Sequence, residues 1–319
     1  MSKNFYDSDF VPLQEIITGH ETDIELENPA MIYEFLRSRI YKQDTYCKAL
    51  ANILYNHTND RPGCYFICGP SGCGKSAGIS ALRELWPNTI VVDSASLSAS
   101  GWSGDAKIRD FTKMIDPEDP RAIVCFDEFD KLVDAHTNSA GENTSEMLQH
   151  EFLKLIDGCV TGGKFNADCS KITFLFCGSF SKKANAIAKH DGGSSFGFNS
   201  NAKVCHAYDR DLTIKDLIDF GLIVELASRC EGITTLKPLT LDDYRYLLKH
   251  HESSPLKKLE KKHGIRLSVS DAKLDEIART AFESELGVRN CYAQIKRLID
   301  DEVFESFVRG EGKPDEISL

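Results

Sequence analysis

Several features that mark other classes of protein are scarce or missing in this sequence. No apolar run approaches the roughly 20 residues that cross a membrane, and the first residues lack the basic start and apolar core of a secretory signal. Positive charge is also scarce, since 38 Lys and Arg face 49 Asp and Glu and the net charge is −11. Such an acidic surface repels phosphate backbones. We therefore expect a cytoplasmic protein that does not bind membranes, and we do not expect it to bind nucleic acid non-specifically.

Cysteine is present but is not arranged for metal or disulfide chemistry. Eleven cysteines are scattered along the 319 residues without one CxxC pair. Paired cysteines at that spacing are the usual sign of a zinc site, and disulfides belong to oxidising compartments. The pattern predicts reduced, partly buried thiols.

Short apolar runs predict a parallel sheet. Four runs and a fifth candidate alternate with longer polar or helical stretches, which indicates strands covered on both faces. Their positions are 64–68, 89–92, 122–126, 172–177 and, as the candidate, 232–236. After Pro238 the apolar spacing is that of helices only.

The chain is long enough for one large domain and one smaller domain, each with its own core. We predict an acidic N-terminal arm over 1–28 and a large α/β domain over 29–236, with a parallel five-stranded sheet between helices. The third region, over 237–319, is predicted to be a small all-helical domain.

A glycine-rich loop follows the first apolar run. The stretch GPSGCGKS, residues 69–76, fits the pattern G-x-x-x-x-G-K-[ST], with a strand predicted before it and a helix after it. Glycines let the backbone curl so that its N–H groups point at phosphate oxygens, and the helix N-terminus adds partial positive charge. Lys75 is placed to reach the β- and γ-phosphates and Ser76 to ligate Mg²⁺. A chance match in a glycine-rich turn is the weaker interpretation, so the sequence predicts a bound nucleoside triphosphate.

The residues of this loop expected to contact the nucleotide are Gly69, Pro70, Ser71, Gly72, Cys73, Gly74, Lys75, Ser76 and Ala77. Cys73 suggests a further hypothesis, because a helix N-terminus and a nearby lysine both lower the pKa of a thiol. Oxidation or alkylation of Cys73 would then block ATP binding. The alternative is that any small residue fits at this position.

Two acids follow the third apolar run, in the stretch AIVCFDEFDK. Asp127 is placed to hold Mg²⁺ through water, opposite Ser76, and Glu128 to orient and deprotonate the attacking water. Acids at the end of a strand are also common on plain protein surfaces. With the phosphate loop upstream, the pair predicts ATP hydrolysis as well as binding.

These motifs resemble those of AAA+ ATPases and, more narrowly, of the ClpX-type protein unfoldases in the Clp/HslU-like group. The resemblance runs from about residue 29 to near residue 300. Residues 39–57 are similar to the helix that precedes the phosphate loop, which implies that Ile40 and Tyr41 pack on the adenine.

The resemblance also implies functional roles for two arginines and one polar residue. Arg229, in the stretch 219–240, would be the arginine finger that acts on a neighbouring subunit, although a surface salt bridge is the simpler interpretation. Arg289, in LGVRN, would touch the phosphates from the small domain, although it could also be an ordinary residue at a helix start. The sensor 1 position falls near Cys177 and Gly178, where Ser179 is a candidate substitute.

A glycine-hinged aromatic loop follows the second apolar run. By the resemblance, Gly101, Trp102, Ser103 and Gly104 would line an axial pore, where a large aromatic can grip a polypeptide regardless of its sequence. The alternative is that Trp102 anchors the loop in a partly buried position. We favour the grip, because a loop rich in Gly and Ser is a poor setting for a buried anchor.

Three features depart from the ClpX-type pattern. The zinc-binding domain that family members carry at the N-terminus has no CxxC counterpart here, and the basic pore-entrance loop is missing. The peptidase-docking tripeptide has a counterpart in Phe196-Gly197-Phe198, which could dock on a ClpP-like peptidase ring or fold back on its own domain.

The resemblance implies an ATP- and Mg²⁺-dependent protein unfoldase that forms a homo-oligomeric ring, expected to be a hexamer, and acts on protein substrates. Two other functions remain open at this point. One is a non-proteolytic remodeller of a specific protein complex, and the other is a DNA-linked AAA+ switch or loader. A nucleotide-binding scaffold without turnover is disfavoured by the complete set Lys75, Asp127, Glu128 and Arg229.

Overall fold

The computed structural model describes residues 26–98, 106–115, 119–134, 144–158, 168–191, 206–284 and 287–319. Residues 1–25 of the predicted arm lie outside these ranges. So do the aromatic loop Gly101–Gly104 and the tripeptide Phe196–Phe198. None of the described helices has the length and apolarity needed to cross a bilayer.

The predicted five-stranded parallel sheet is confirmed, and its strands run in the order β2-β5-β6-β1-β7. Each strand coincides with one of the apolar runs. The strands are β1 (Cys64–Cys68), β2 (Thr89–Asp93), β5 (Ile123–Asp127), β6 (Thr173–Gly178) and β7 (Gly232–Thr235). Because all five are parallel, the loops that follow β1, β5 and β6 leave from the same edge of the sheet.

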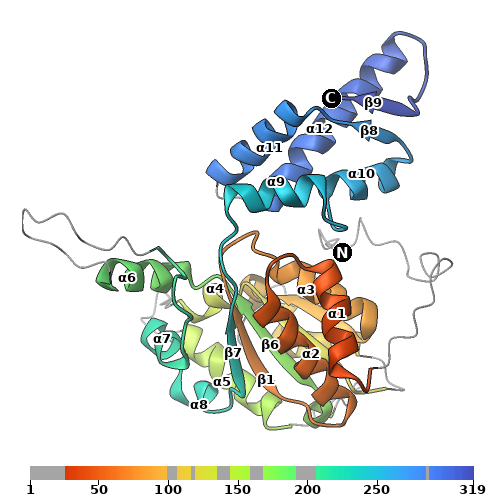
Figure 1. Ribbon diagram of the computed structural model, residues 1–319. Coiled ribbons are helices and arrows are strands. Elements are labelled where there is room, and N and C mark those ends of the chain that lie inside the picture. The colour runs from red at the N-terminus through yellow and green to blue at the C-terminus, as the bar shows by residue number, and fades with distance from the viewer. Residues whose placement is uncertain are drawn as a thin grey trace, which may run out of the picture.

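Helices cover both faces of this sheet (Figure 1). One face packs against α1 (Pro29–Arg39), α2 (Asp44–Thr58) and α3 (Lys75–Leu85). The other packs against α4 (Phe129–Val133), α5 (Thr144–Ile156), α6 (Ser181–Asp191), α7 (Ile214–Phe220) and α8 (Val224–Ala227).

Alternate residues of the central strands serve the two faces, which is why these strands read as continuous apolar runs. In β6, Leu175 and Cys177 contribute to the core under α1–α3, whereas Phe174 and Phe176 contribute to the opposite core. The sheet is therefore fixed between two apolar layers, and the loops at its carboxyl edge start from a rigid base.

The small domain lies beyond the carboxyl edge of the sheet (Figure 1). Its helices are α9 (Leu241–Lys249), α10 (Pro255–His263), α11 (Asp271–Glu283) and α12 (Val288–Val308). Thr240 and Ser270 are the N-caps of α9 and α11, and their side chains accept backbone hydrogen bonds. The change from sheet to helices falls between Thr235 and Leu241.

The prediction of an all-helical small domain is wrong in one respect. Two short parallel strands, β8 (Arg266–Ser268) and β9 (Glu316–Ser318), pair beside the helices. Ile317 of β9 is buried in the small-domain core, so the last residues of the chain close that core. Two further strands, β3 (Leu97–Ser98) and β4 (Ala106–Lys107), form a minor pair in the large domain.

Candidate nucleotide-binding site

The phosphate loop connects β1 to α3, and two of its glycines have left-handed backbone angles. Gly72 has φ +73° and Gly74 has φ +111°, a region that favours glycine. Space is a second reason for glycine at position 72. A Cβ atom there would lie 2.3 Å from the Cα of Gly287, which precedes α12. The tip of the loop thus touches the small domain backbone to backbone.

Lys75 is the first residue of α3 and bends over the loop. Its Nζ donates to the carbonyl oxygens of Gly69 at 2.6 Å and Pro70 at 2.8 Å. Behind it, the buried Tyr46 hydroxyl donates to the Lys75 carbonyl at 2.9 Å. The ammonium group is therefore held at the loop, where phosphate oxygens can replace the two carbonyls as its acceptors.

Asp127 and Glu128 lie at the same edge of the sheet, where β5 ends. The Asp127 carboxylate accepts from the Glu128 backbone N–H at 2.9 Å. Glu128 has φ +55°, which is uncommon for a residue with a side chain, and its carboxylate pairs with Lys131. A strained backbone of this kind is often found at active sites.

Asp130, which the sequence reasoning did not single out, ties these acids to the end of β6. Its carboxylate accepts from the Ser179 hydroxyl at 2.8 Å, the Ser179 N–H at 3.1 Å and the Phe180 N–H at 3.2 Å. Among the sensor 1 candidates, Cys177 is buried and Ser179 carries the polar side chain. Asp130 thus holds Ser179 beside the turn that carries Glu128.

Arg289 brings the small domain to the phosphate loop. Its guanidinium donates to the Ser76 hydroxyl at 3.0 Å, across 213 positions of sequence. This contact puts a cation from α12 beside the residue expected to hold Mg²⁺.

The residues expected at the adenine lie between the two domains. Ile40 is buried, and its side chain lies beside Gly74 of the loop. The Tyr41 ring stacks on Tyr246 of α9 with centroids 4.9 Å apart, and its hydroxyl donates to Asp243 at 3.2 Å. Tyr246 was missed in the sequence, because nothing local distinguishes it from other tyrosines of an amphipathic helix.

Arg229 lies away from the phosphate loop of its own chain. It precedes β7, which pairs in parallel with β1 from Tyr65 onward, whereas the loop follows the other end of β1. A strand of this length spans about 15 Å. The guanidinium makes a two-pronged pair with Asp157 at 2.6 and 2.7 Å. This hydrogen bonding raises the pKa of Arg229 and lowers the pKa of Asp157.

The hypothesis of a reactive thiolate at Cys73 is wrong for this structure. Its side chain is buried, and burial raises the pKa of the thiol despite the nearby Lys75. Removal from water disfavours the charged form more than the lysine favours it. The nine described cysteines are free thiols, as predicted, and eight of them are buried.

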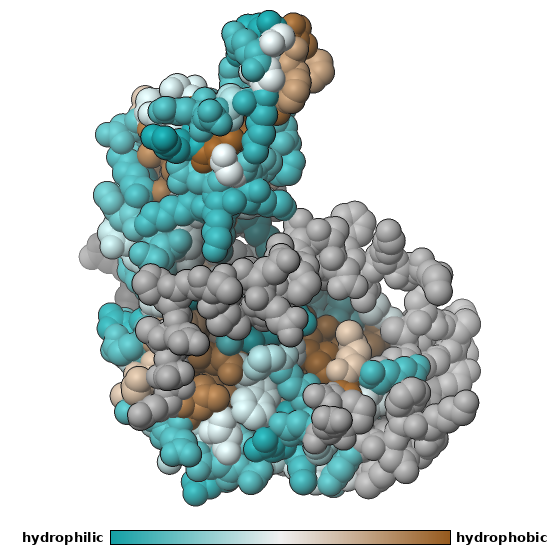
Figure 2. All heavy atoms as spheres, turned by 90° about the vertical axis from the view of Figure 1, so that its right-hand side faces the viewer, coloured by the Kyte–Doolittle hydropathy of each residue, from teal (hydrophilic) through white to brown (hydrophobic). Residues whose placement is uncertain are grey.

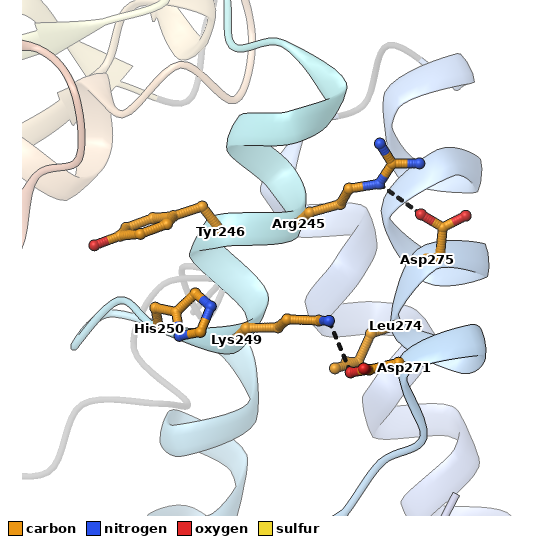
Figure 3. Close-up of a pocket in the computed structure, with 7 residues that line it drawn as sticks. All are labelled: Arg245, Tyr246, Lys249, His250, Asp271, Leu274 and Asp275. Carbon is orange, nitrogen blue, oxygen red and sulfur yellow. Dashed lines mark hydrogen bonds and ion pairs between the residues drawn. The ribbon is translucent and has the colours of Figure 1, made fainter.

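A cavity of about 250 Å³ opens on the small domain between α9 and α11 (Figure 3). Arg245 reaches Asp275 at 2.5 Å and Lys249 reaches Asp271 at 2.7 Å, so the cations that line the cavity are already neutralised. Tyr246 is among the residues that line this cavity, and none of the residues of the phosphate loop is. The phosphate-binding residues therefore belong to a separate region, between the two domains.

The described residues fit Mg²⁺ bound together with a nucleotide. The Ser76 hydroxyl and the Asp127 carboxylate would offer oxygen ligands, which Mg²⁺ prefers. No cluster of three or more metal-binding side chains occurs in the described part of the chain.

Comparison with known proteins agrees with this geometry. Residues 65–178 match the family model for the ATPase family associated with various cellular activities (AAA). Residues 245–318 match the model for the C-terminal, D2-small domain of ClpB protein. The five-stranded sheet and the phosphate loop are those of an AAA+ ATPase domain, in agreement with the first match.

Within that class the chain is similar to proteins named ATP-dependent Clp protease ATP-binding subunit ClpX. The relative from Porphyromonas gingivalis is 26% identical over 88% of this chain and 78% of its own length. The relatives from Bacteroides thetaiotaomicron and Bacteroides fragilis are also 26% identical over 88% of this chain, and over 78% and 77% of their own lengths. The expected resemblance to ClpX-type ATPases is thereby confirmed.

Proposed function

We propose that the chain is a protein unfoldase that couples ATP hydrolysis to movement of its small domain. The observation that carries this proposal is the contact of Arg289 with Ser76, because a site shared by two domains responds to its ligand by changing how the domains sit. Similarity to ClpX over 88% of the chain supports the same function.

In the proposed site each polar group has one task. Lys75 binds the β- and γ-phosphates, Ser76 and Asp127 hold Mg²⁺, and Glu128 takes a proton from the attacking water. Bound Mg²⁺ neutralises charge on the phosphates. Arg289 contacts the phosphates from the small domain, and Ile40 and Tyr41 contact the base.

Arg229 completes the site of a neighbouring copy in a ring, which we take to be a hexamer. Its place at the amino edge of the sheet supports this role, since it lies a strand's length from its own phosphate loop. Before it can act, the guanidinium must leave Asp157, whose side chain is about half exposed.

A mixing experiment tests the role in trans. Lys75→Ala and Arg229→Ala proteins are each expected to be inactive alone. Mixed rings would contain some interfaces with an intact Lys75 site facing an intact Arg229, so ATP hydrolysis should recover on mixing. Hydrolysis that stays at background after subunit exchange would rule out the shared site.

Threading of a protein substrate by Trp102 is tested through its effect on turnover. Unfolded model protein is expected to stimulate hydrolysis by the wild type, Glu128→Gln should abolish hydrolysis, and Trp102→Ala should remove only the stimulation. Stimulation that survives in Trp102→Ala would end the pore-loop assignment.

Docking of Phe196-Gly197-Phe198 on a ClpP-like peptidase is a separate hypothesis. The wild type should be retained by an immobilised ClpP-type ring, and Phe198→Ala should not. Equal retention of both proteins, or none, would reject the docking role and would favour a non-proteolytic remodeller.

A DNA-linked switch or loader is the other candidate class. The net charge of −11 argues against it. Stimulation of hydrolysis by DNA and not by unfolded protein would favour that class.

Buried free thiols suit a reducing compartment, so we place the activity in the cytoplasm.

A further inference from the structure

Gln43 is a buried polar residue just before α2, and no role above uses it. Its side-chain nitrogen donates to the carbonyl oxygens of Lys237 at 2.8 Å and Cys73 at 3.2 Å. Its side-chain oxygen accepts from the Lys237 N–H at 3.1 Å. Only 5% of Gln43 is exposed, so water does not replace these partners easily.

The two partners of Gln43 belong to the two parts of the site. Cys73 lies in the phosphate loop between Gly72 and Gly74. Lys237 lies in the short linker from β7 to α9, which is the connection to the small domain. A primary amide has both donors and an acceptor, so this one neutral side chain can bind a peptide N–H and two carbonyls together.

The Lys237 side chain adds a second link from the linker to the catalytic edge of the sheet. Its Nζ donates to the Tyr208 carbonyl at 2.8 Å and pairs with Asp211 at 2.8 Å. The Tyr208 hydroxyl in turn donates to the Ser179 carbonyl at 2.6 Å. Through Ser179 this chain of hydrogen bonds reaches Asp130, next to the turn of Glu128.

Backbone strain is concentrated along these links. Five described non-glycine residues have positive φ. Four of them adjoin or belong to the network, namely Lys42, Glu128, Phe180 and Tyr208. Such conformations persist where the surroundings impose them, and they tend to mark functional sites.

We infer that Gln43 is a positioning residue that couples the phosphate loop to the domain linker. Its three hydrogen bonds, one buried and two partly buried, make the Cys73 carbonyl and the Lys237 peptide move as one unit, because separating them would leave the buried Gln43 amide unpaired. A nucleotide that reorganises the loop therefore shifts the linker and, with it, the small domain. The inference rests on the ATPase activity and not on the threading of protein.

The test is amide hydrogen exchange of the full-length chain, with and without a non-hydrolysable ATP analogue and Mg²⁺. In the wild type the analogue should slow exchange over the linker and α9. Gln43→Met keeps the approximate shape and removes all three hydrogen bonds, and it should reduce this change at least fivefold. Because coupling is reciprocal, the analogue should also bind this variant about 5- to 20-fold more weakly than it binds the wild type.

Gln149→Met is the matched control. Gln149 is also buried, and its amide donates to the Gly221 carbonyl at 3.1 Å and accepts from the Ile223 N–H at 2.9 Å. Both partners lie within the large domain. This variant should lose thermal stability as Gln43→Met does, yet keep the wild-type response of the linker to the analogue.

A second variant guards against a folding defect in Gln43→Met. Gln43→Glu keeps the acceptor for the Lys237 N–H but faces two carbonyl oxygens with a carboxylate, and it should also lose the response. A wild-type response in either folded Gln43 variant, or a wild-type linker that ignores the analogue, would overturn the inference. Because no protein substrate is used, the result is independent of whether the chain threads proteins.

Discussion

The interior of the large domain is packed with apolar side chains, whereas its boundary with the small domain is mostly polar. Behind the catalytic edge of the sheet lies a cluster of phenylalanines. Phe176 meets Phe129 with ring centroids 4.4 Å apart, and Phe126 meets Phe152 at 4.8 Å. All four are fully buried. Close-packed aromatic rings resist rearrangement, so the strands that carry Asp127 and Ser179 are fixed in place.

The boundary between the domains is mostly polar. Lys42 pairs with Asp243 at 2.8 Å, Gln43 binds the linker, and Arg289 binds Ser76. Tyr41 stacked on Tyr246 is an aromatic contact in the same region. The exposed contacts of Lys42 and Arg289 can be exchanged for water or phosphate, whereas apolar contacts and the contacts of the buried Gln43 cannot. The strands that carry the acidic residues are therefore held rigidly, whereas the small domain meets the large domain partly through contacts that can be exchanged.

The surface of the small domain is mostly polar, like its boundary with the large domain. Most of its visible surface is hydrophilic, with apolar colour at the end farthest from the large domain (Figure 2). Phe304, Phe307 and Val308, near the end of α12, are each at least 60% exposed. The small domain has an apolar core of its own, which includes residues of α9, α10, α11, α12 and β9.

The largest expected effect comes from opening the aromatic core. Phe176→Ala should lower the free energy of unfolding by about 3–5 kcal/mol, because a buried ring is lost and a cavity remains. Denaturant unfolding followed by circular dichroism measures this change. Phe304→Ala is the matched control and should cost less than about 0.5 kcal/mol, since its ring is 66% exposed. Equal costs would contradict the contrast between core and surface.

Loss of the Lys75 ammonium group should have the second largest effect, on ATP turnover. Lys75→Ala should reduce ATP turnover about 10²- to 10³-fold, the effect of removing one preorganised group that stabilises developing charge. Stability should change little, because the Lys75 side chain bonds two loop carbonyls and neither bond joins it to a core residue. Steady-state phosphate release measures turnover, with Lys296→Ala on α12 as control. Turnover within threefold of the wild type would remove Lys75 from the site.

Acid should weaken the large domain through His57. Burial lowers the pKa of His57 to about 4, so the unfolded chain takes up this proton near pH 6.5 while the folded chain does not. The free energy of unfolding should therefore fall between about pH 6.5 and pH 4, by at most about 3 kcal/mol from this group, and His57 should have no effect above that range.

His57→Gln isolates this contribution from those of the carboxylates. The amide can still bond the Thr173 hydroxyl, which lies 2.8 Å from the His57 ring nitrogen Nδ1. The difference in unfolding free energy between wild type and variant should depend on pH only within that window. Parallel pH profiles would show that His57 does not titrate as its burial requires.

The smallest effect is expected at the polar boundary. Lys42→Met should cost about 1 kcal/mol or less, because the Lys42 side chain is 56% exposed and Asp243 keeps hydrogen bonds from Thr240 and Tyr41. The cost should shrink further in high salt. Urea unfolding at two salt concentrations checks both statements. A loss above about 3 kcal/mol would mean that the boundary is as rigid as the core.

Features with a local signal could be predicted from the sequence. The five strands of the main sheet are continuous apolar runs, and the phosphate loop is a contiguous motif. The pair β8 and β9 could not be predicted in this way, because each strand has only three residues and the two lie about 50 residues apart. The end of the chain contributes to the small-domain core only because of this pairing.

The wrong or missed parts of the site share a physical cause. Cys73 was judged by its neighbours in sequence, whereas its pKa follows from burial by the whole fold. Gln43 meets Lys237 across 194 positions, and Arg229 meets Asp157 across 72. Contacts at such separations depend on the completed tertiary structure, and no local sequence pattern predicts them.

The most direct test asks whether the small domain completes the ATPase site. ATP hydrolysis should be measured against ATP concentration for the wild type, Arg289→Ala and Arg297→Ala. Both arginines lie on α12, but Arg297 pairs with Asp301 at the surface. We predict that Arg289→Ala lowers kcat/KM for ATP about tenfold or more and that Arg297→Ala matches the wild type. Wild-type values of kcat/KM in Arg289→Ala would show that Arg289 of the small domain does not contribute to ATP hydrolysis.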